Sequence, residues 1–175
     1  MDVYEAIAAR RSIRRYKPDP VGEEQVTRVL DAARLAPSWK NLQCWRFIVV
    51  RSETGKTGIL SGFDDSNPGK KAITAAPVMI VLCVDPQASG KMGDKEYYLV
   101  DAGIAMENLM LAARAEGLGT CWLGEFNEAP VKESLGIPDN WRIVGMTPLG
   151  YPDQDPKPRP RKTMEEIVFA ERWPD

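Results

Sequence analysis

The sequence predicts an α+β protein in which helices and a sheet pack in layers. Apolar residues recur at helical spacing in several segments, and short runs rich in β-branched and aromatic residues lie between them. The order of these segments is not the strict alternation of strand and helix that produces a parallel α/β sheet. At 175 residues the chain is long enough to bury a core of its own. We therefore expect one domain spanning residues 1–175.

The first half of the chain predicts helices around one strand. Apolar positions on a helix face begin at Val3 and again at Val26, and Pro18 and Pro20 make the connection between them extended. The run WRFIVV has the β-branched and aromatic composition of a strand. The expected elements are helices over 2–10, 23–35 and 53–61 and a strand over 45–50.

The second half combines a buried strand with the longest helix. Residues 62–71 (GFDDSNPGKK) are polar, so we expect a mobile surface loop there. Residues 76–84 (APVMIVLCV) are almost continuously apolar, as in a strand covered on both faces. The helix expected over 94–116 is apolar on nearly every side between 102 and 113, which predicts a central, buried position, with Gly117 at its C-terminal cap. The remaining expected elements are strands over 120–123 and 142–149 and a helix over 130–135.

The C-terminal tail, residues 152–175, has two parts. Residues 152–162 are too rich in proline to fold alone and are expected to run extended over a surface. Residues 166–173 turn apolar again and need a surface to bury against. We expect the tail to pack on a partner subunit.

The chain contains no histidine and only three cysteines, Cys44, Cys83 and Cys121, which lie far apart. Ser–His–Asp triads, Cys–His dyads, histidine-ligated metals and zinc-type cysteine pairs are therefore not expected. Cys121 and the helical residue Asp101 are interpreted as packing residues. An enzyme of this composition takes its reactivity from a cofactor, and no metal is expected.

Two basic clusters interrupt a chain that is otherwise acidic. Residues 10–17 hold five cations and no acid, and residues 157–162 hold four more, which leaves 14 of the 23 cations against all 25 acids. This distribution favours a small anion over a long nucleic acid. No segment has the length of a membrane span, so we expect a cytoplasmic protein that binds neither a membrane nor nucleic acid.

The first basic cluster contains the stretch RRSIR. Arginine pairs bidentately with phosphate and serine adds a neutral donor, which makes Arg10, Arg11, Ser12 and Arg14 candidates for an anion site. A solvated basic surface is the alternative. For the second cluster the alternative is a solvated, disordered tail, which composition alone favours.

Two other segments suit a flat heteroaromatic ligand. Residues 36–45 (APSWKNLQCW) offer amide donors and acceptors side by side, although Ser38 and Asn41 could merely satisfy a turn. Residues 116–125 (EGLGTCWLGE) contain glycines that permit close approach of the backbone. A dinucleotide-binding fingerprint is rejected, because these glycines follow a helix and precede a strand.

Together these segments resemble the nitroreductase family of FMN enzymes. The matching stretches are RRSIRRY, APSWKNLQCWRFIVV, AAPVMIVLCVD, YYLVDAGIAMENLMLAARAEGLGTCWLG, and PLGYP followed by KPRPRK. The ordered set, which covers essentially the whole chain, is specific, whereas each motif by itself is weak. The resemblance implies an α+β sandwich with a mostly antiparallel central sheet flanked by helices. It also implies an intertwined homodimer with two FMN molecules at its interface.

The resemblance further implies a role for each site residue. Arg14 would approach the N1–C2 edge of the isoalloxazine ring, where a cation stabilises the reduced ring. The residues expected at the phosphate and ribityl chain are Arg10, Arg11, Ser12, Arg161 and Arg159. Those expected against the ring are Trp122, Leu123 and Gly124. Those expected from the other subunit are Pro37, Ser38, Asn41 and Gln43.

Three positions depart from the family pattern. Trp39 and Lys40 stand where small residues are common, and Cys44 stands where a proline is usual before Trp45. Because the chain is short, its substrate lid would be only the segment 62–71. The iodotyrosine deiodinase branch shares the RRS motif but has a structured lid that does not map onto this sequence.

The implied activity is a ping-pong reaction in which NAD(P)H reduces FMN and an electron-poor small molecule, such as a nitroaromatic or a quinone, then takes the electrons. No side chain acts as a nucleophile, and Trp39 or Phe63 would form a wall of the pocket. Two alternatives remain: a flavin enzyme with another reaction, such as deiodination or flavin cleavage, and a flavin- or phosphate-binding protein without activity.

Overall fold

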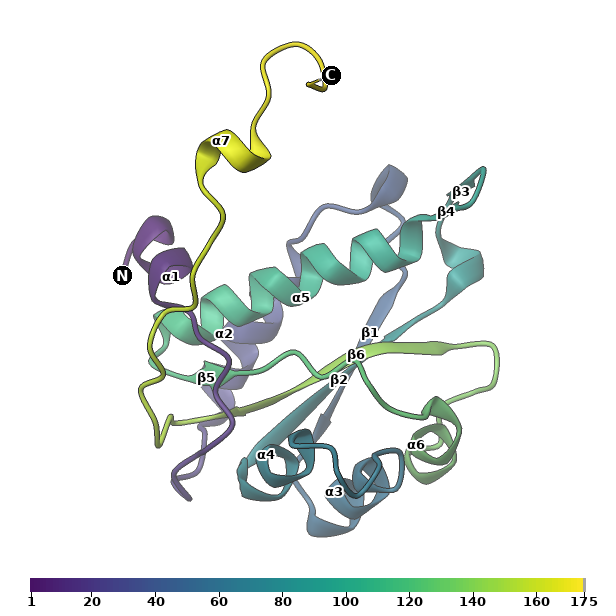
Figure 1. Ribbon diagram of the computed structural model, residues 1–175. Helices are drawn as coiled ribbons and strands as arrows, with labels where there is room; N and C mark the ends of the chain where they lie inside the picture. Colours follow the sequence, from purple (N-terminus) through teal and green to yellow (C-terminus); the bar gives the residue numbers. More distant parts are fainter. Residues whose placement is uncertain (175) are drawn as a thin grey trace.

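A computed structural model describes residues 1–174 of the chain, in which a four-stranded sheet lies between two layers of helices (Figure 1). The strand order is β1-β2-β6-β5, and every neighbouring pair is antiparallel. The strands are β1 (Trp45–Val50), β2 (Val78–Val84), β5 (Gly119–Thr120) and β6 (Arg142–Gly150). The predicted α+β class and antiparallel sheet are confirmed.

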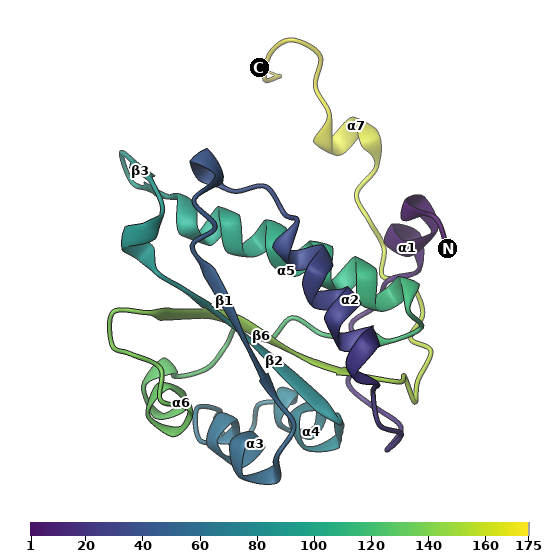
Figure 2. The ribbon, with the colours of Figure 1, turned by 180° about the vertical axis from the view of Figure 1, so that it is seen from behind.

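The helices divide between the two faces of this sheet. Figure 2 shows α2 and α5 together on one face, with α3, α4 and α6 on the other. The first group comprises α1 (Val3–Ala9), α2 (Glu23–Arg34) and α5 (Tyr97–Ala115). The second comprises α3 (Glu53–Leu60), α4 (Gly69–Ala75) and α6 (Glu128–Leu135).

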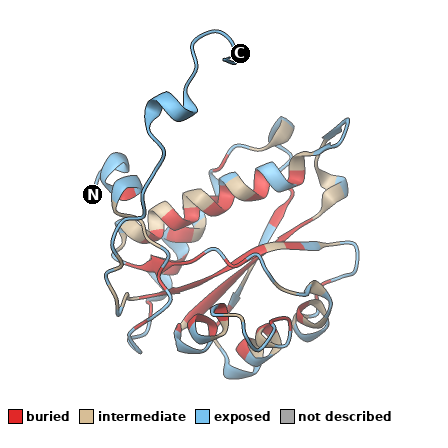
Figure 3. Ribbon diagram, in the orientation of Figure 1, coloured by how far each residue is buried: buried red, intermediate tan, exposed pale blue. Residues whose placement is uncertain are grey.

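Strand β2 is the centre of the core. Its side chains alternate between two apolar clusters, because successive residues of a strand point to opposite faces. Ile80 and Leu82 pack with α2 and α5, whereas Met79 and Val81 pack with the opposite helix layer. All seven residues of β2 are buried, which confirms the strand predicted to be covered on both faces (Figure 3).

The predicted loop over 62–71 is wrong only in its last three residues, because α4 (Gly69–Ala75) begins at Gly69. Ala72 and Ile73 of this helix are fully buried, while the flanking lysines are less enclosed. The apolar contacts that hold α4 come from distant parts of the chain, and local composition did not reveal them.

The start predicted for the long helix is also wrong. A small hairpin of β3 (Lys91–Met92) and β4 (Lys95–Glu96) precedes α5, which begins at Tyr97. The short helical turns η1 (Trp39–Asn41) and η2 (Pro86–Ala88) were not predicted either. Gly117 does follow α5 with a positive φ of 77°, as expected of a helix-terminating glycine.

Helix α5 is not buried on every side, contrary to the prediction. Its inner face contributes residues such as Met106 and Leu109 to the core, but Val100 and Ile104 are exposed on the opposite face and Leu99 is exposed near the start of the helix. Apolar side chains on the outer side of α5 are therefore left uncovered in the single chain.

The tail leaves the body of the molecule beside α1 and carries the short helix α7 (Met164–Ile167) (Figure 1). Its apolar residues are exposed in the single chain, and packing of the tail on a partner remains a prediction. None of the described helices is both long and apolar enough to cross a membrane.

Candidate functional site

The first basic cluster is presented by an extended segment that follows α1. The helix ends where Arg10 takes an extended conformation, with φ −61° and ψ 133°. Beyond it, the N–H of Ile13 donates to the carbonyl oxygen of Thr120 at 2.8 Å, so the segment adds to the edge of the sheet. Ile13 and Tyr16 turn into the protein, whereas Ser12 and Arg14 are exposed. This alternation directs the polar side chains away from the core.

The tail runs beside this segment. The N–H of Lys17 donates to the carbonyl oxygen of Tyr151 at 2.9 Å, and the N–H of Asp153 donates to that of Arg15 at 3.0 Å. Gln154 adds a side-chain bond to the carbonyl oxygen of Ser12 at 3.5 Å. These bonds bring the second basic cluster to the first, although about 140 residues separate them in the sequence.

The two clusters line one cavity of about 460 Å³. Cavities of this size accommodate small ligands. The predicted site residues that line it are Arg10, Arg11, Ser12, Arg14, Arg159 and Arg161. Such a concentration of guanidinium groups attracts an anion, and their binding of phosphate remains a prediction.

Arg11 also has a structural role. Its Nη1 donates to the carbonyl oxygens of Ala8 at 2.7 Å and of Arg10 at 2.8 Å. These bonds satisfy backbone acceptors where α1 ends. Arg10 instead faces Glu107 of α5, with Nε 3.5 Å from the carboxylate. Burial raises the pKa of Glu107, and the charge of Arg10 partly opposes that rise.

A second, smaller cavity of about 150 Å³ adjoins the first, because Arg14 lines both. The predicted ring-contacting residues Trp122, Leu123 and Gly124 form its wall with Phe63. Phe63 also packs on Phe126, with ring centroids 5.6 Å apart. The chain therefore has a basic cavity that continues, past one arginine, into an aromatic one.

Glycines position the Trp122 indole. A Cβ atom at Gly145 would lie 2.8 Å from Cζ2 of this ring, and one at Gly124 would lie 2.8 Å from its Nε1. At Gly119 a Cβ atom would collide with Ile13, also at 2.8 Å. Close approach by side chains of the protein itself therefore explains Gly119 and Gly124, whose purpose was open in the sequence.

Residues 36–45, the amide-rich loop, lie at the N-terminal end of α5, away from both cavities (Figure 1). Pro37, Ser38, Asn41 and Gln43 are therefore not brought to Arg10 within one chain. Their contribution from a partner subunit remains a prediction. Internal bonds shape the loop: the N–H of Gln43 donates to Ser38 Oγ at 3.0 Å, and Gln43 Nε2 donates to Asn41 Oδ1 at 3.1 Å.

Three residues of this loop, Lys40, Asn41 and Gln43, have positive φ angles of 47°, 57° and 51°. Such angles are uncommon for residues other than glycine and persist only where surrounding contacts enforce them. Sequence reasoning missed this feature, because only Asn41 is of a type that visits this region readily.

Asp101 of α5 is the buried anchor of the loop. Only 2% exposed, it accepts from the N–H of Trp39 and from Ser89 Oγ, both at 2.9 Å. Cys44 Sγ lies 3.7 Å from Asp101 Oδ2, the same oxygen that accepts from Ser89. The interpretation of Asp101 as a simple packing residue therefore understated its role.

Trp39 lies against the hairpin before α5 and not against the aromatic cavity. Its ring is 4.0 Å from that of Tyr97, and a Cβ atom at Gly90 would overlap the indole. Within one chain, Phe63 is the predicted pocket wall that lines the cavity with Trp122.

Residues 7–151, most of the chain, match the sequence model of the nitroreductase family. The chain belongs to the nitroreductase family.

Solved structures have the same fold. A nitroreductase family protein from Clostridium novyi NT is 40% identical, with a TM-score of 0.85 over 99% of this chain and 95% of that one. A structure from Desulfovibrio desulfuricans, described as a nitroreductase in complex with FMN, is 30% identical, with a TM-score of 0.86 over 99% of each chain. The NADPH-flavin oxidoreductase of Vibrio harveyi is 31% identical over 181 residues, 97% of this chain and 73% of that protein.

The three thiols of this nitroreductase-family chain are enclosed in the protein. Burial raises the pKa of Cys44 and of Cys83 to about 11, and it raises that of Cys121 as well. All three are buried and free. Since the thiolate is the reactive form, the interpretation of Cys121 as a packing residue is preferred to a redox role.

Proposed function

We propose that this chain is a homodimeric FMN enzyme that uses NAD(P)H to reduce electron-poor small molecules, such as nitroaromatics or quinones, by a ping-pong mechanism. The observation that carries the proposal is the basic cavity shared by residues from both ends of the sequence. A cavity lined by five arginines and a serine fits the phosphate and ribityl oxygens of FMN. The adjoining aromatic cavity fits the isoalloxazine ring.

When bound, FMN supplies two-electron transfer, first from NAD(P)H and then to an acceptor in the same place. The chain supplies binding and charge. Arg10, Ser12, Arg159 and Arg161 would hold the phosphate end, and Arg14 would place a positive charge beside the ring, where it would favour the reduced form. Because the chemistry resides on the cofactor, no side chain is required as a nucleophile.

The remaining site residues shape the acceptor position. Trp122, Leu123 and Gly124 lie against the ring, and Phe63 walls the space in which an acceptor stacks. Asn67 holds the segment before α4, since its Nδ2 donates to the carbonyl oxygen of Glu125 at 3.1 Å. Motion of this segment as a lid is part of the proposal.

The partner subunit completes the site. Pro37, Ser38, Asn41 and Gln43 reach the FMN of the other chain, which accounts for their distance from Arg10 in their own. Exposed apolar residues on α1, α5 and the tail supply the dimer surface. In this proposal residues 1–175 form one domain, the tail from 152 onward packs on the partner, and the enzyme acts in the cytoplasm.

The test is the absorption spectrum of the purified protein, followed by anaerobic titration with NADH and with NADPH. We expect the protein to carry flavin or to take up added FMN. We also expect NADH or NADPH to bleach the flavin absorption. Protein that neither carries flavin nor takes up FMN would overturn the proposal.

Two other outcomes would replace the proposed activity with a different function. Bound FMN that neither nucleotide nor a ferredoxin-type donor reduces would indicate a flavin-binding protein without activity. Reduction without turnover of nitroaromatics or quinones, in acceptor screens under air and under argon, would indicate another flavin reaction, such as deiodination or flavin cleavage.

A further inference from the structure

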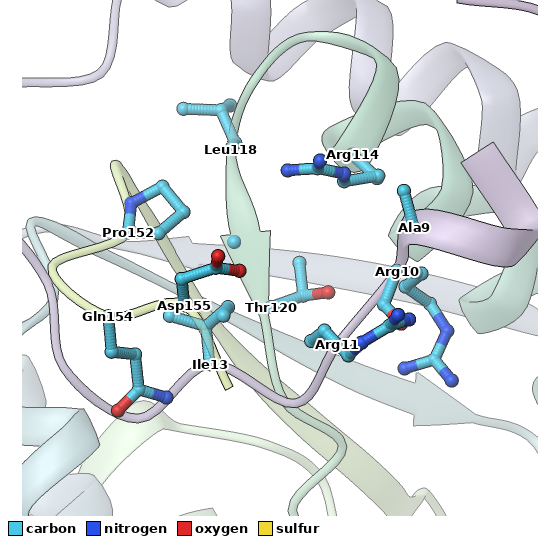
Figure 4. Close-up of a pocket in the computed structure, with 11 residues that line it drawn as sticks. Ala9, Arg10, Arg11, Ile13, Arg114, Leu118, Thr120, Pro152, Gln154 and Asp155 are labelled. Atoms are coloured by element: carbon cyan, nitrogen blue, oxygen red, sulfur yellow. The ribbon is translucent and has the colours of Figure 1, made fainter. Parts of the chain in front are cut away.

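Behind the basic cavity lies a smaller one of about 50 Å³, shown in Figure 4. Four parts of the chain enclose it: the end of α5, strand β5 with the residue before it, the segment that follows α1, and the start of the tail. Arg10 and Arg11 line both this cavity and the larger one. The small cavity therefore backs directly onto the proposed phosphate site.

Arg114, in the last turn of α5, projects into this space (Figure 4). Its Nε is buried and has no hydrogen-bond partner among residues 1–174. Buried donors in folded proteins are nearly always paired with protein or ordered water, because an unpaired one is destabilising. The proposed cofactor site does not account for this arginine.

Asp155 lines the opposite side of the same cavity, on the tail (Figure 4). It follows the last bonds that tie the tail to the basic segment, those of Asp153 and Gln154. Beyond it, prolines at 156, 158 and 160 have no N–H with which to join the sheet. The course of the tail toward Arg159 and Arg161 therefore depends on what holds Asp155.

We propose that Arg114 and Asp155 form a water-bridged ion pair across this cavity, and that the pair positions Arg159 and Arg161 at the phosphate site. The cavity exceeds the roughly 10–15 Å³ that one water occupies, and it offers charged partners on both sides. Both residues act on the tail and neither touches the cofactor. The expected effect on FMN binding rests on the proposed function, whereas the ion pair itself does not.

The test compares Arg114→Met, Asp155→Asn and the double variant with the unaltered protein. Asp153→Asn is the matched control, since Asp153 is exposed and does not line the cavity. Hydrogen exchange of residues 152–163 in FMN-free protein reports the tail directly, and FMN affinity reports its consequence. The rate of reduction by NADH at saturating FMN reports the chemistry.

We expect each single variant to exchange faster in the tail and to bind FMN about tenfold more weakly, whereas the control does neither. The double variant should bind FMN no more weakly than either single variant, because each single change already removes the same interaction. Reduction at saturating FMN should stay unchanged.

The ion pair would be overturned if the losses of FMN affinity added up in the double variant. It would also be overturned if hydrogen exchange of residues 152–163 were unaltered in Asp155→Asn. Asp155 is exposed, so its replacement by asparagine tests the inference even if Arg114→Met does not fold. Failure of the unaltered protein to bind FMN would overturn the proposed function instead. In that case the exchange measurement still decides whether the pair exists.

Discussion

Arg10 and Ser12 occupy neighbouring positions on the extended segment but have different surroundings. Arg10 is half-buried and faces the carboxylate of Glu107, whereas Ser12 is exposed at the mouth of the basic cavity. The ion pair holds Arg10 in place before any ligand arrives. A guanidinium fixed in this way loses less conformational freedom on binding phosphate.

Replacing Arg10 or Ser12 with alanine is expected to weaken FMN binding by about 1–3 kcal/mol, because in the proposed site each change would remove a hydrogen bond to a charged phosphate. Quenching of flavin fluorescence at fixed ionic strength measures the affinity. Arg15→Ala serves as the control, since it removes the same charge from a position that lines neither cavity. Unchanged affinity in both test variants would contradict the phosphate assignment.

Helix α5 connects three functional regions at the scale of an element. Asp101 near its start anchors the amide-rich loop, Glu107 in its middle faces Arg10, and Arg114 in its last turn reaches the cavity beneath the tail. A helix rises about 1.5 Å per residue and is stiff, so it keeps these groups at fixed separations. The same helix buries its other face in the core.

Asp101→Ala is expected to lower the free energy of unfolding by about 2–4 kcal/mol, since it leaves the N–H of Trp39 and the hydroxyl of Ser89 without their acceptor. Denaturant unfolding measures this change. Ser89→Ala is the matched control and should cost about 1 kcal/mol, because the bond to the loop remains. Equal losses in the two variants would show that Asp101 does not anchor the loop.

At the scale of the whole molecule, the apolar surface is unevenly distributed. Exposed apolar residues gather on α1, on one face of α5 and along the tail, while the helices on the far side of the sheet expose few. Such a concentration of exposed apolar side chains is typical of interaction surfaces, and their burial in an interface remains a prediction. The site proposed above needs such an interface, because its amide-rich loop lies away from its own basic cavity.

Val100→Glu is expected to convert a dimer into a monomer and to abolish tight FMN binding, because a buried charge at the interface is strongly unfavourable. Val100 is 52% exposed on the single chain, so its replacement should leave the fold intact. Sedimentation velocity and flavin content measure the two effects. Thr57→Glu adds the same charge at an exposed position of α3, across the sheet, and should change neither. A Val100→Glu protein that stays dimeric would place the interface elsewhere.

Local patterns in the sequence were sufficient for most of the fold. The run WRFIVV matches β1, and the apolar run ending at Val84 matches β2. Both strands were predictable because β-branched residues and a continuous apolar run are recognisable in the local sequence. Helix α4, the hairpin before α5 and the loop turn η1 were missed. Helix α4 and the turn η1 depend on contacts from distant segments, such as the burial of Ile73 and the bond to Asp101. The hairpin is held by local pairing between Lys91–Met92 and Lys95–Glu96, in a stretch with no apolar alternation to indicate strands.

For the site, the sequence by itself determined which chemical groups are available. These are two basic clusters, no histidine, and amide and glycine segments in an order that resembles one family of flavin enzymes. Only the tertiary structure decided which of these residues meet. It brought Arg159 and Arg161 to the cavity of Arg10, left the amide-rich loop apart, and added Asp101 as an anchor of that loop and Arg114 as a buried donor beside the basic cavity. The physical reason is that composition specifies which groups can bind an anion, whereas backbone pairing between distant segments specifies where those groups lie.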